Sequence, residues 1–274
     1  MTTSIDHIAF IGGGNMASAI MGGLLKRGMP ADQIQVIEPF EEQRHKIQKQ
    51  FGVAVHSEPG PYLTSATMVV WAVKPQTFKD AALQTRQHIQ TALQLSVAAG
   101  IRSNSIAQWL GTERVVRSMP NTPALISQGI TALFARSAAT ADDKSAVERV
   151  IKTTGDYLWL ENEAQLDAVT ALSGSGPAYV FYFIEAMIDA GVEMGLNRDQ
   201  ARQLAVATFY GSSALAKAAN EPPEILRARV TSKGGTTYAA INCMDEDHIK
   251  TLFIRAMQAA KQRALELGDA FGAD

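Results

Sequence analysis

Two glycine-containing segments of this sequence have the residue types and spacing that can bind an anion. In Ile8–Ile20 an apolar run stops at three glycines, and a helix-compatible run begins at Asn15. Gly12 permits a tight turn, Gly14 allows the backbone to approach a pyrophosphate, and the small Ala17 allows close packing of helix on strand. The helix N-terminus would offer free N–H groups and a positive dipole end. The segment predicts the phosphate-binding turn of a dinucleotide-binding unit; the alternative is a turn that only packs.

The second segment, Val230–Thr237, places two glycines and four hydroxyl side chains directly before a helix-compatible run at Tyr238–Cys243. Flexible backbone N–H groups, hydroxyl donors and a helix N-terminus together make a site suited to an anion. An ordinary hydroxyl-rich helix cap would have the same composition. The pattern by itself leaves both interpretations open.

In the first half of the chain, short apolar runs alternate with helix-compatible runs. The runs that predict strands are Ile8–Ile11, Ile34–Ile37, Val53–Val55, Thr67–Val73, Leu93–Ala98, Arg114–Arg117, Ile130–Phe134 and Tyr157–Leu160. Thr67–Val73 is almost continuously apolar, which is typical of a parallel strand covered on both faces. The alternation predicts an α/β fold with a Rossmann-type doubly wound, mostly parallel sheet.

From Glu163 onward the strand-like runs disappear. Helices are expected at Leu166–Leu172, Tyr179–Met194, Asp199–Ala219 and Asp245–Leu267, with an interruption at Ser173–Pro177. Apolar side chains surround most of Asp199–Ala219, so that helix must be buried on most sides. We therefore expect a dinucleotide-binding Rossmann-like domain at 1–162. The all-helical domain expected at 163–274 would bind substrate and pack against a second copy of the chain.

Ligands of open α/β sheets bind beyond the carboxyl ends of the strands, which selects a set of cofactor-binding residues. Glu38 follows the second predicted strand, where an acidic side chain commonly accepts from the adenosine ribose hydroxyls. A carboxylate there would repel a ribose 2′-phosphate and favour NAD over NADP, although Arg44 or Lys46 could offset this; a solvated loop position is the alternative. The predicted cofactor-binding residues are Ile11, Gly12, Gly14, Asn15, Met16, Glu38, Val73, Lys74, Pro75, Ala98, Ala99, Gly100 and Asn121.

The composition excludes several other classes of protein. A net charge of −2 over 274 residues, without a basic block, gives no indication of nucleic-acid binding. The five histidines are scattered without the spacing of metal ligands, so no metal site is expected. Cys243 is the single cysteine, which suits a reducing cytoplasm. No export signal and no apolar run near the ~18 residues of a membrane span are visible, so we expect a cytoplasmic protein that does not enter a membrane.

A combination of motifs is more specific than any one of them. In chain order the sequence contains GGGNMASAI, WAVKPQ, AAGI, RSMPNTPA, DAVTALSGSGPAY and VTSKGGTT. With these motifs the chain resembles the Δ1-pyrroline-5-carboxylate reductases from about Ile8 to Leu267, nearly its whole length. One departure is Lys233, where the family usually has proline, which changes the stiffness and charge of that turn.

The resemblance implies a reaction and a site. Members of the family reduce the cyclic imine 1-pyrroline-5-carboxylate to L-proline, the last step of proline biosynthesis, with NADPH or NADH. By resemblance the catalytic residues are Thr237, whose hydroxyl lies at the ring nitrogen, and Glu163, whose charge would favour a cationic iminium. The substrate-binding residues implied are Ser232, Gly234, Gly235, Thr236, Thr237, Thr170 and Ser175. The resemblance also implies homodimers with interlocked helical domains, often assembled into decamers.

Two other classes of function have to be weighed. A β-hydroxyacid-type dehydrogenase relies on a lysine in its first long interdomain helix, and Leu172–Met194 contains none; a related imine reductase shares the same architecture. A non-catalytic NAD(P)-binding regulator would not need the hydroxyl- and glycine-rich turn at Val230–Thr237.

Overall fold

The structure is a computed structural model that describes residues 7–89 and 91–272, and it forms two compact units. Unit 1 comprises Met1–Ser175 and Ala260–Asp274, and unit 2 comprises Gly176–Ala259. The predicted domain division at 162/163 follows the change from alternating to all-helical sequence. The compact units are divided thirteen residues later in the chain, and unit 1 also takes the C-terminal end of the last helix. The division at 162/163 therefore remains a prediction.

Unit 1 is built on one eight-stranded sheet in the order β3-β2-β1-β4-β5-β6-β7-β8. The strands are β1 (Ile8–Ile11), β2 (Ile34–Ile37), β3 (Ala54–His56), β4 (Met68–Trp71), β5 (Leu93–Ser96), β6 (Val115–Met119), β7 (Gly129–Ala135) and β8 (Gly155–Trp159). Every neighbouring pair is parallel except β6 and β7, which are antiparallel. The predicted mostly parallel sheet is confirmed.

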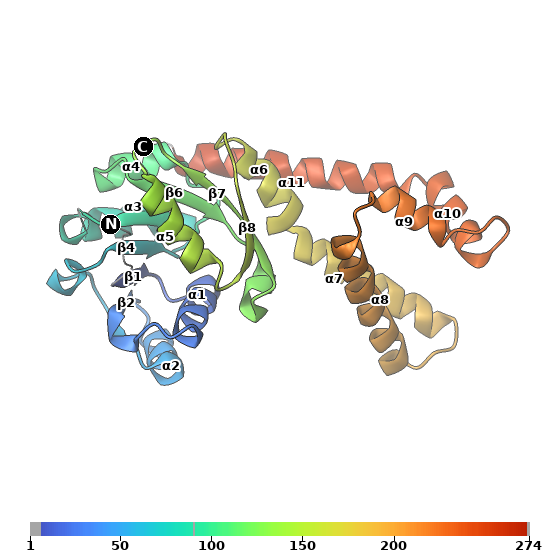
Figure 1. Cartoon of the computed structure of the whole chain (residues 1–274), viewed down its shortest axis with the longest axis horizontal. Coiled ribbons are helices and arrows are strands. Elements are labelled where there is room, and N and C mark those ends of the chain that lie inside the picture. Colours follow the sequence, from blue (N-terminus) through green and yellow to red (C-terminus); the bar gives the residue numbers. More distant parts are fainter. Residues whose placement is uncertain (1–6, 90, 273–274) are drawn as a thin grey trace. The chain divides into compact units, whose positions relative to one another are not determined.

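Helices cover both faces of this sheet because its strands bury side chains on both sides (Figure 1). The helices of unit 1 before residue 160 are α1 (Asn15–Lys26), α2 (Glu41–Phe51), α3 (Pro75–Thr85), α4 (Ser103–Leu110) and α5 (Ala141–Ile151). One apolar core joins α1, α2 and α5 to side chains such as Phe10 and Val70, and a second joins α3 and α4 to Trp71 and Val115. This is the doubly wound arrangement.

The chain stays helical where an interruption was expected. Helix α6 (Gln165–Val169) continues through a π-helical turn at Thr170–Gly174 into α7 (Gly176–Glu193). The Ser175 N–H donates to the carbonyl of Thr170 at 2.8 Å, which keeps the backbone coiled. Pro177 lies in the first turn of α7, where a missing N–H costs nothing. The predicted break at Ser173–Pro177 is therefore wrong; the segment is a bulged helix.

Unit 2 contains α7, α8 (Arg198–Ala218), α9 (Pro223–Arg229), α10 (Thr236–Glu246) and the first part of α11 (Ile249–Gly272). The single helix predicted from Asp245 to Leu267 is wrong at its start, because the backbone breaks at His248, whose φ is +55°. Large apolar side chains remain exposed on these helices, among them Phe181, Tyr182, Leu204, Tyr210 and Leu215. Such surface is typical of a face that packs against another chain.

Candidate active site

The first glycine turn has a backbone that only glycine can adopt. Gly12 has a φ of +94°, and a Cβ atom there would lie 2.6 Å from the carbonyl oxygen of Ala72. The Gly12 N–H donates to the carbonyl of Ile37 at 2.8 Å, which ties the turn to the end of β2. The turn is thus wedged between the carboxyl ends of β4 and β2, the edge where ligands of this fold bind.

The start of α1 is open to an anion. Its N-cap is Gly14, no side chain caps the helix, and its first turn contains no acidic residue. A Cβ on Gly14 would meet no atom within 4 Å, so the space beside this residue is open. The first N–H groups of a helix lack intrahelical partners. Because Asn15 and Met16 begin this helix, the cofactor set predicted around Gly12–Met16 has the backbone donors that a pyrophosphate requires.

Glu38 is not the solvated loop residue of the alternative interpretation, because it is only 6% exposed. Its Oε2 accepts from the Gly13 N–H at 2.9 Å, and its Oε1 accepts from the Phe40 N–H at 3.0 Å. Arg44 does not face the carboxylate; its guanidinium donates to the carbonyls of Glu38 and Pro39. Each carboxylate oxygen keeps a second lone pair, so Glu38 supports the glycine turn and still has acceptor capacity for a ribose hydroxyl.

The other predicted cofactor residues follow the neighbouring strands β4, β5 and β6. Lys74 is an exposed N-cap and Pro75 the first residue of α3, while Ala98 is buried and Gly100 has a φ of +73°. The side-chain oxygen of Asn121 accepts from the Ile130 N–H at 3.0 Å, so it holds β7 rather than pointing free. Strands β1, β4, β5 and β6 run parallel, so their carboxyl ends lie at one edge of the sheet. The predicted cofactor residues that follow these strands, Val73 and Ala99 included, therefore lie at the same edge as Ile11 and Gly12.

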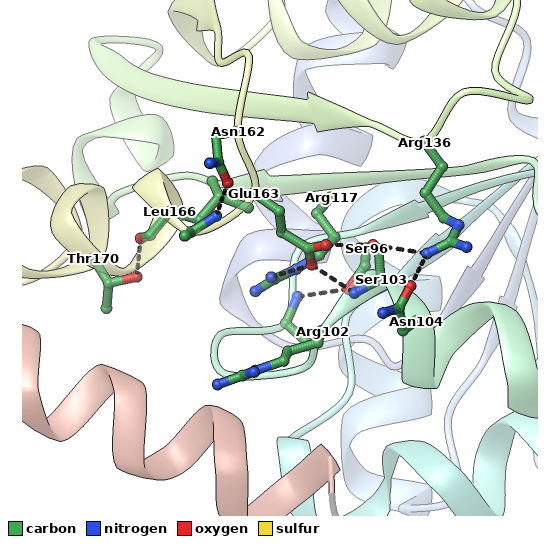
Figure 2. A network of polar contacts seen from close by, with 12 residues as sticks. Ser96, Arg102, Ser103, Asn104, Arg117, Arg136, Asn162, Glu163, Leu166 and Thr170 are labelled. Atoms are coloured by element: carbon green, nitrogen blue, oxygen red, sulfur yellow. Dashed lines mark hydrogen bonds and ion pairs between the residues drawn. The ribbon is translucent and has the colours of Figure 1, made fainter.

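Glu163 lies in a network of polar contacts within unit 1 (Figure 2). Its Oε1 accepts from the Ser103 N–H and from Nη1 of Arg117, both at 2.6 Å, and its Oε2 accepts from the Ser103 hydroxyl at 2.5 Å. Burial raises the pKa of Glu163, but the hydrogen bonds from Ser103 and the Arg117 charge outweigh it, so the pKa is lowered. The carboxylate caps the N-terminus of α4 and neutralises Arg117, which is 7% exposed.

A cavity of about 290 Å³ lies next to this network, between α4, α6 and the end of α11. Asp167 lines the cavity, and the pKa of its carboxyl is raised because burial outweighs the attraction of Arg117 and Arg102. Of the two predicted pocket residues on this segment, Thr170 donates its hydroxyl to the Leu166 carbonyl at 2.8 Å. Ser175 is half-buried at the end of the bulged turn.

The second glycine turn begins α10 in unit 2. Gly234 has a φ of +77°, and the Gly235 N–H donates to the Ser232 carbonyl at 3.0 Å, closing the turn. Gly235 is the N-cap, so Thr236 and Thr237 are the first two residues of the helix. No side chain caps α10 and its first turn contains no acidic residue. The open N-terminus of an eleven-residue helix, with exposed hydroxyl groups on it, suits a carboxylate ligand.

Two other helices, α5 and α8, are capped by side chains. Thr140 and Asp143 form a reciprocal capping box at α5, and Asn197 and Gln200 form one at α8. The starts of α1 and α10 therefore differ from these in having a glycine where a side chain could have satisfied the N–H groups.

The predicted residues fall into two groups, one in each unit. The cofactor set, Glu163, Thr170 and Ser175 belong to unit 1, and the turn from Ser232 to Thr237 belongs to unit 2. Ser103 and Arg117, the partners of Glu163, were not among the predicted site residues. The signal for Arg117 was available, since a charged residue in an otherwise apolar strand needs a buried partner.

The described residues contain neither a candidate metal site nor a helix that could span a membrane. Within residues 7–89 and 91–272, no three His, Cys, Asp or Glu side chains gather where they could hold a metal ion. None of the helices in that part of the chain combines the length and apolar character needed to cross a membrane.

A doubly wound sheet with an open glycine turn at its ligand-binding edge, followed by a helical unit, defines a class of nicotinamide-dinucleotide oxidoreductases. Comparison with known proteins supports this class at both ends of the chain. Residues 7–100 match a family described as NADP oxidoreductase, coenzyme F420-dependent, and residues 163–267 match one described as pyrroline-5-carboxylate reductase dimerisation.

Curated relatives and solved structures agree with these matches. A pyrroline-5-carboxylate reductase of Pseudomonas aeruginosa is 43% identical, covering 98% of this chain and 99% of the relative; one of Arabidopsis thaliana is 35% identical, covering 95% of each. The structure of a pyrroline-5-carboxylate reductase from Coxiella burnetii superposes with a TM-score of 0.89 at 35% identity, covering 96% of this chain and 99% of that one. The chain belongs to the pyrroline-5-carboxylate reductase family, which confirms the resemblance inferred from its motifs.

Proposed function

We propose that this protein reduces 1-pyrroline-5-carboxylate to L-proline by hydride transfer from a reduced nicotinamide dinucleotide, the last step of proline biosynthesis. Besides family membership, one observation supports this proposal: α10 begins at Gly235 with no side-chain cap and no acidic residue in its first turn, beside the exposed Lys233. A small carboxylate is the ligand that such a helix start favours.

The residues of the chain divide the work of this reaction. The turn formed by Ser232, Gly234, Gly235 and Thr236 holds the substrate carboxylate. It does so through its hydroxyls and its N–H groups other than that of Gly235, which closes the turn on the Ser232 carbonyl. The reduced nicotinamide, when bound, supplies the hydride that adds to the imine carbon. The nitrogen then gains an electron pair and becomes basic, so Thr237 places its hydroxyl at this atom to donate a hydrogen bond and relay a proton that water supplies.

Glu163 takes a supporting part in this proposal. Its carboxylate already accepts from Ser103 and Arg117, so its charge acts on a cationic iminium through space and not through a free oxygen. Thr170 and Ser175 line the substrate end of the site.

We propose NADPH as the cofactor, with NADH also accepted. The solved structure of the Plasmodium falciparum pyrroline carboxylate reductase, 26% identical with a TM-score of 0.86 over 98% of this chain and 99% of that one, is described with NADP bound. Glu38 acts in the other direction, since a carboxylate at the ribose repels a 2′-phosphate. The ratio of the KM values for NADH and NADPH measures which cofactor the protein prefers.

We also propose that the active form is a homodimer built on the helical unit. The exposed apolar side chains of α7 and α8 and the match to a dimerisation family support it. A decamer is the larger assembly that sedimentation would test, and a stable monomer at micromolar concentration would contradict the proposal. Cytoplasmic location belongs to the same proposal and is supported by the single free cysteine, Cys243.

The test of function is an assay of the purified protein with 1-pyrroline-5-carboxylate and either NADPH or NADH. We expect loss of the reduced nicotinamide absorbance and formation of proline. If neither cofactor is oxidised while both still bind, the non-catalytic regulator becomes the better interpretation. A β-hydroxyacid dehydrogenase is disfavoured because α7 contains no lysine.

A further inference from the structure

The loop that follows β5 is covered by the last turns of α11. Gly100 in this loop has a φ of +73°, and a Cβ atom on it would lie 3.4 Å from Cβ of Leu267 and 3.5 Å from Cδ2 of Phe271. Phe271 is half-buried and packs against the apolar core of α3 and α4. The helix therefore lies close beside the loop, near enough that a side chain at Gly100 would touch it, and both belong to unit 1.

Polar contacts join the same two segments. The guanidinium of Arg102, two residues after Gly100, forms an ion pair with Asp269, and Arg102 extends toward the α11 ribbon in Figure 2. A Cβ atom on Gly268 would lie 3.4 Å from Nε of Arg102, so the glycine leaves room for the Arg102 side chain beside the helix. Arg102 is also the N-cap of α4, so this contact reaches the start of the next helix.

The contacting residues of α11 form one stripe of the helix. Ala264, Leu267, Gly268 and Phe271 recur at three- and four-residue spacing, which places them on one face. Ala264 and Gly268 are buried, whereas Glu266 and Asp269 are exposed. The stripe shows that the C-terminal turns are docked along their length and not held by one contact.

We propose that the end of α11 is a positioning element for the nicotinamide end of the cofactor site. The loop Ala98–Gly100 follows the carboxyl end of β5, at the sheet edge that binds ligands. It has few bonds of its own to the sheet; the Ala98 N–H donates to the Ser96 hydroxyl at 3.3 Å. Leu267 and Phe271 restrict this loop from the opposite side. The proposal rests on the proposed function and assigns a role to residues that do not touch the reacting atoms.

The dinucleotide offers a way to separate this role from a general loss of stability. The glycine turn and Glu38 follow β1 and β2, where the ADP-ribose is expected to bind. Because β5 lies on the opposite side of β1 from β2 in the sheet, a dinucleotide that crosses this edge would place its nicotinamide end at Ala98–Gly100. If only the loop after β5 becomes looser, the protein should bind NADPH less tightly and bind 2′-phospho-ADP-ribose as before. If the sheet itself is disturbed, the binding of both compounds should weaken.

The decisive variant is Phe271→Ala in the full-length protein. We expect its Kd for NADPH to rise about 5- to 10-fold and its kcat to fall, while the Kd for 2′-phospho-ADP-ribose stays within about 2-fold of the unmodified protein; Phe271→Leu should restore most of the loss. Equal changes in both dissociation constants, or no change in either, would overturn the proposal. Absence of activity in the unmodified protein would instead contradict the proposed function.

A second pair of variants tests the ion pair at an exposed position that cannot unfold the core. Asp269→Asn should raise the KM for NADPH about 2-fold, because Arg102 loses its partner on α11. Glu266→Gln is the matched control, since its carboxylate pairs with Arg263 in the same helix, and it should leave the KM unchanged. If both variants behave alike, Arg102 and Asp269 have no positioning role.

Discussion

The starts of α1 and α10 are alike in composition and differ in what surrounds them. Both helices follow a glycine N-cap, and neither has a side-chain cap or an acidic residue in its first turn. The turn before α1 is held from several sides: Glu38 accepts from the Gly13 N–H, and Gln43 donates to the Gly13 carbonyl at 2.6 Å. The turn before α10 is exposed, and the Gly235 N–H bond to Ser232 closes it from within.

The turn before α1 is therefore held by its surroundings, whereas the turn before α10 is held only by its own backbone. A side-chain cap stabilises a helix by about 0.5–2 kcal/mol, and α5 and α8 of this chain have such caps. Glycine at the same position costs only about a few tenths of a kcal/mol, so α1 and α10 leave their N–H groups for a ligand with little loss of helix stability. In α1 the surrounding sheet fixes the geometry, whereas in α10 the geometry depends on the turn itself.

The largest expected effect comes from filling the space at Gly12. In Gly12→Ala, the left-handed φ costs about 1–2 kcal/mol, and the new Cβ would overlap the Ala72 carbonyl oxygen. We expect cofactor binding to weaken at least about 100-fold and the free energy of unfolding to fall by about 3 kcal/mol or more.

Gly234→Ala is the matched control, because its φ is also positive but a Cβ atom there meets nothing within 4 Å. It should cost only about 1–2 kcal/mol, the penalty of the left-handed φ. Chemical denaturation and cofactor titration check both variants. If the two variants lose similar amounts, the turn before α1 is no more restricted than the turn before α10.

The sequence predicts those features of the structure that depend on neighbouring residues, and not those that depend on distant ones. Apolar runs predicted all eight strands within a few residues, and the glycine spacing predicted the turn at Gly12, because both signals are local. The bond from Gly13 to Glu38 depends on β2 lying beside β1 in the sheet. The contact between Glu163 and Arg117 joins residues 46 positions apart. Neither contact leaves a local pattern in the sequence, so neither could be predicted from it.

A missed helix end has a different cause. No glycine or proline marks the break between α10 and α11, where His248 adopts a φ of +55°. Without such a marker, the last helix was predicted to begin at Asp245, before the break, whereas α11 begins at Ile249. At Thr170–Gly174 the error was the opposite one. Glycine and serine predicted a break in the helix, but the backbone stays coiled there in a π-helical turn.

Removing the charge of Glu163 tests how unit 1 is held around the β5 and β6 ends. Glu163→Gln removes the ion-pair partner of the buried Arg117. Because breaking a buried pair costs about 3–5 kcal/mol, we expect a loss of about 3 kcal/mol in the free energy of unfolding. The pKa of Glu163 is lowered in the folded protein. Its stabilisation is therefore present at neutral pH and is lost as the pH falls below the ordinary value of 4.5.

The stability difference between the unmodified protein and Glu163→Gln should accordingly shrink in acid, as urea denaturation at several pH values would measure. Glu161→Gln, an exposed neighbour, is the control and should cost little. A loss of catalysis without a loss of stability in Glu163→Gln would assign the residue to the reaction instead of the fold.

Thr237 tests the substrate turn without disturbing the cofactor turn. Thr237→Ala removes the hydroxyl proposed to lie at the ring nitrogen, and kcat/KM should fall by an amount corresponding to roughly 1–3 kcal/mol. The Kd for NADPH should not change, since the cofactor residues lie in unit 1. Thr237→Ser keeps the hydroxyl and should retain most of the activity. An unchanged kcat/KM in Thr237→Ala would remove this residue from the mechanism.

The smallest expected effect concerns the choice of cofactor at Glu38. In Glu38→Ala the repulsion of a 2′-phosphate disappears, so the ratio of kcat/KM for NADPH over NADH should rise about 5-fold, or about 1 kcal/mol. The Gly13 and Phe40 N–H groups also lose their acceptor, so both cofactors should bind less tightly. Loss of the acceptor weakens both cofactors equally and leaves the ratio constant, whereas loss of the charge changes the ratio. A constant ratio with weakened binding would therefore limit Glu38 to supporting the turn before α1.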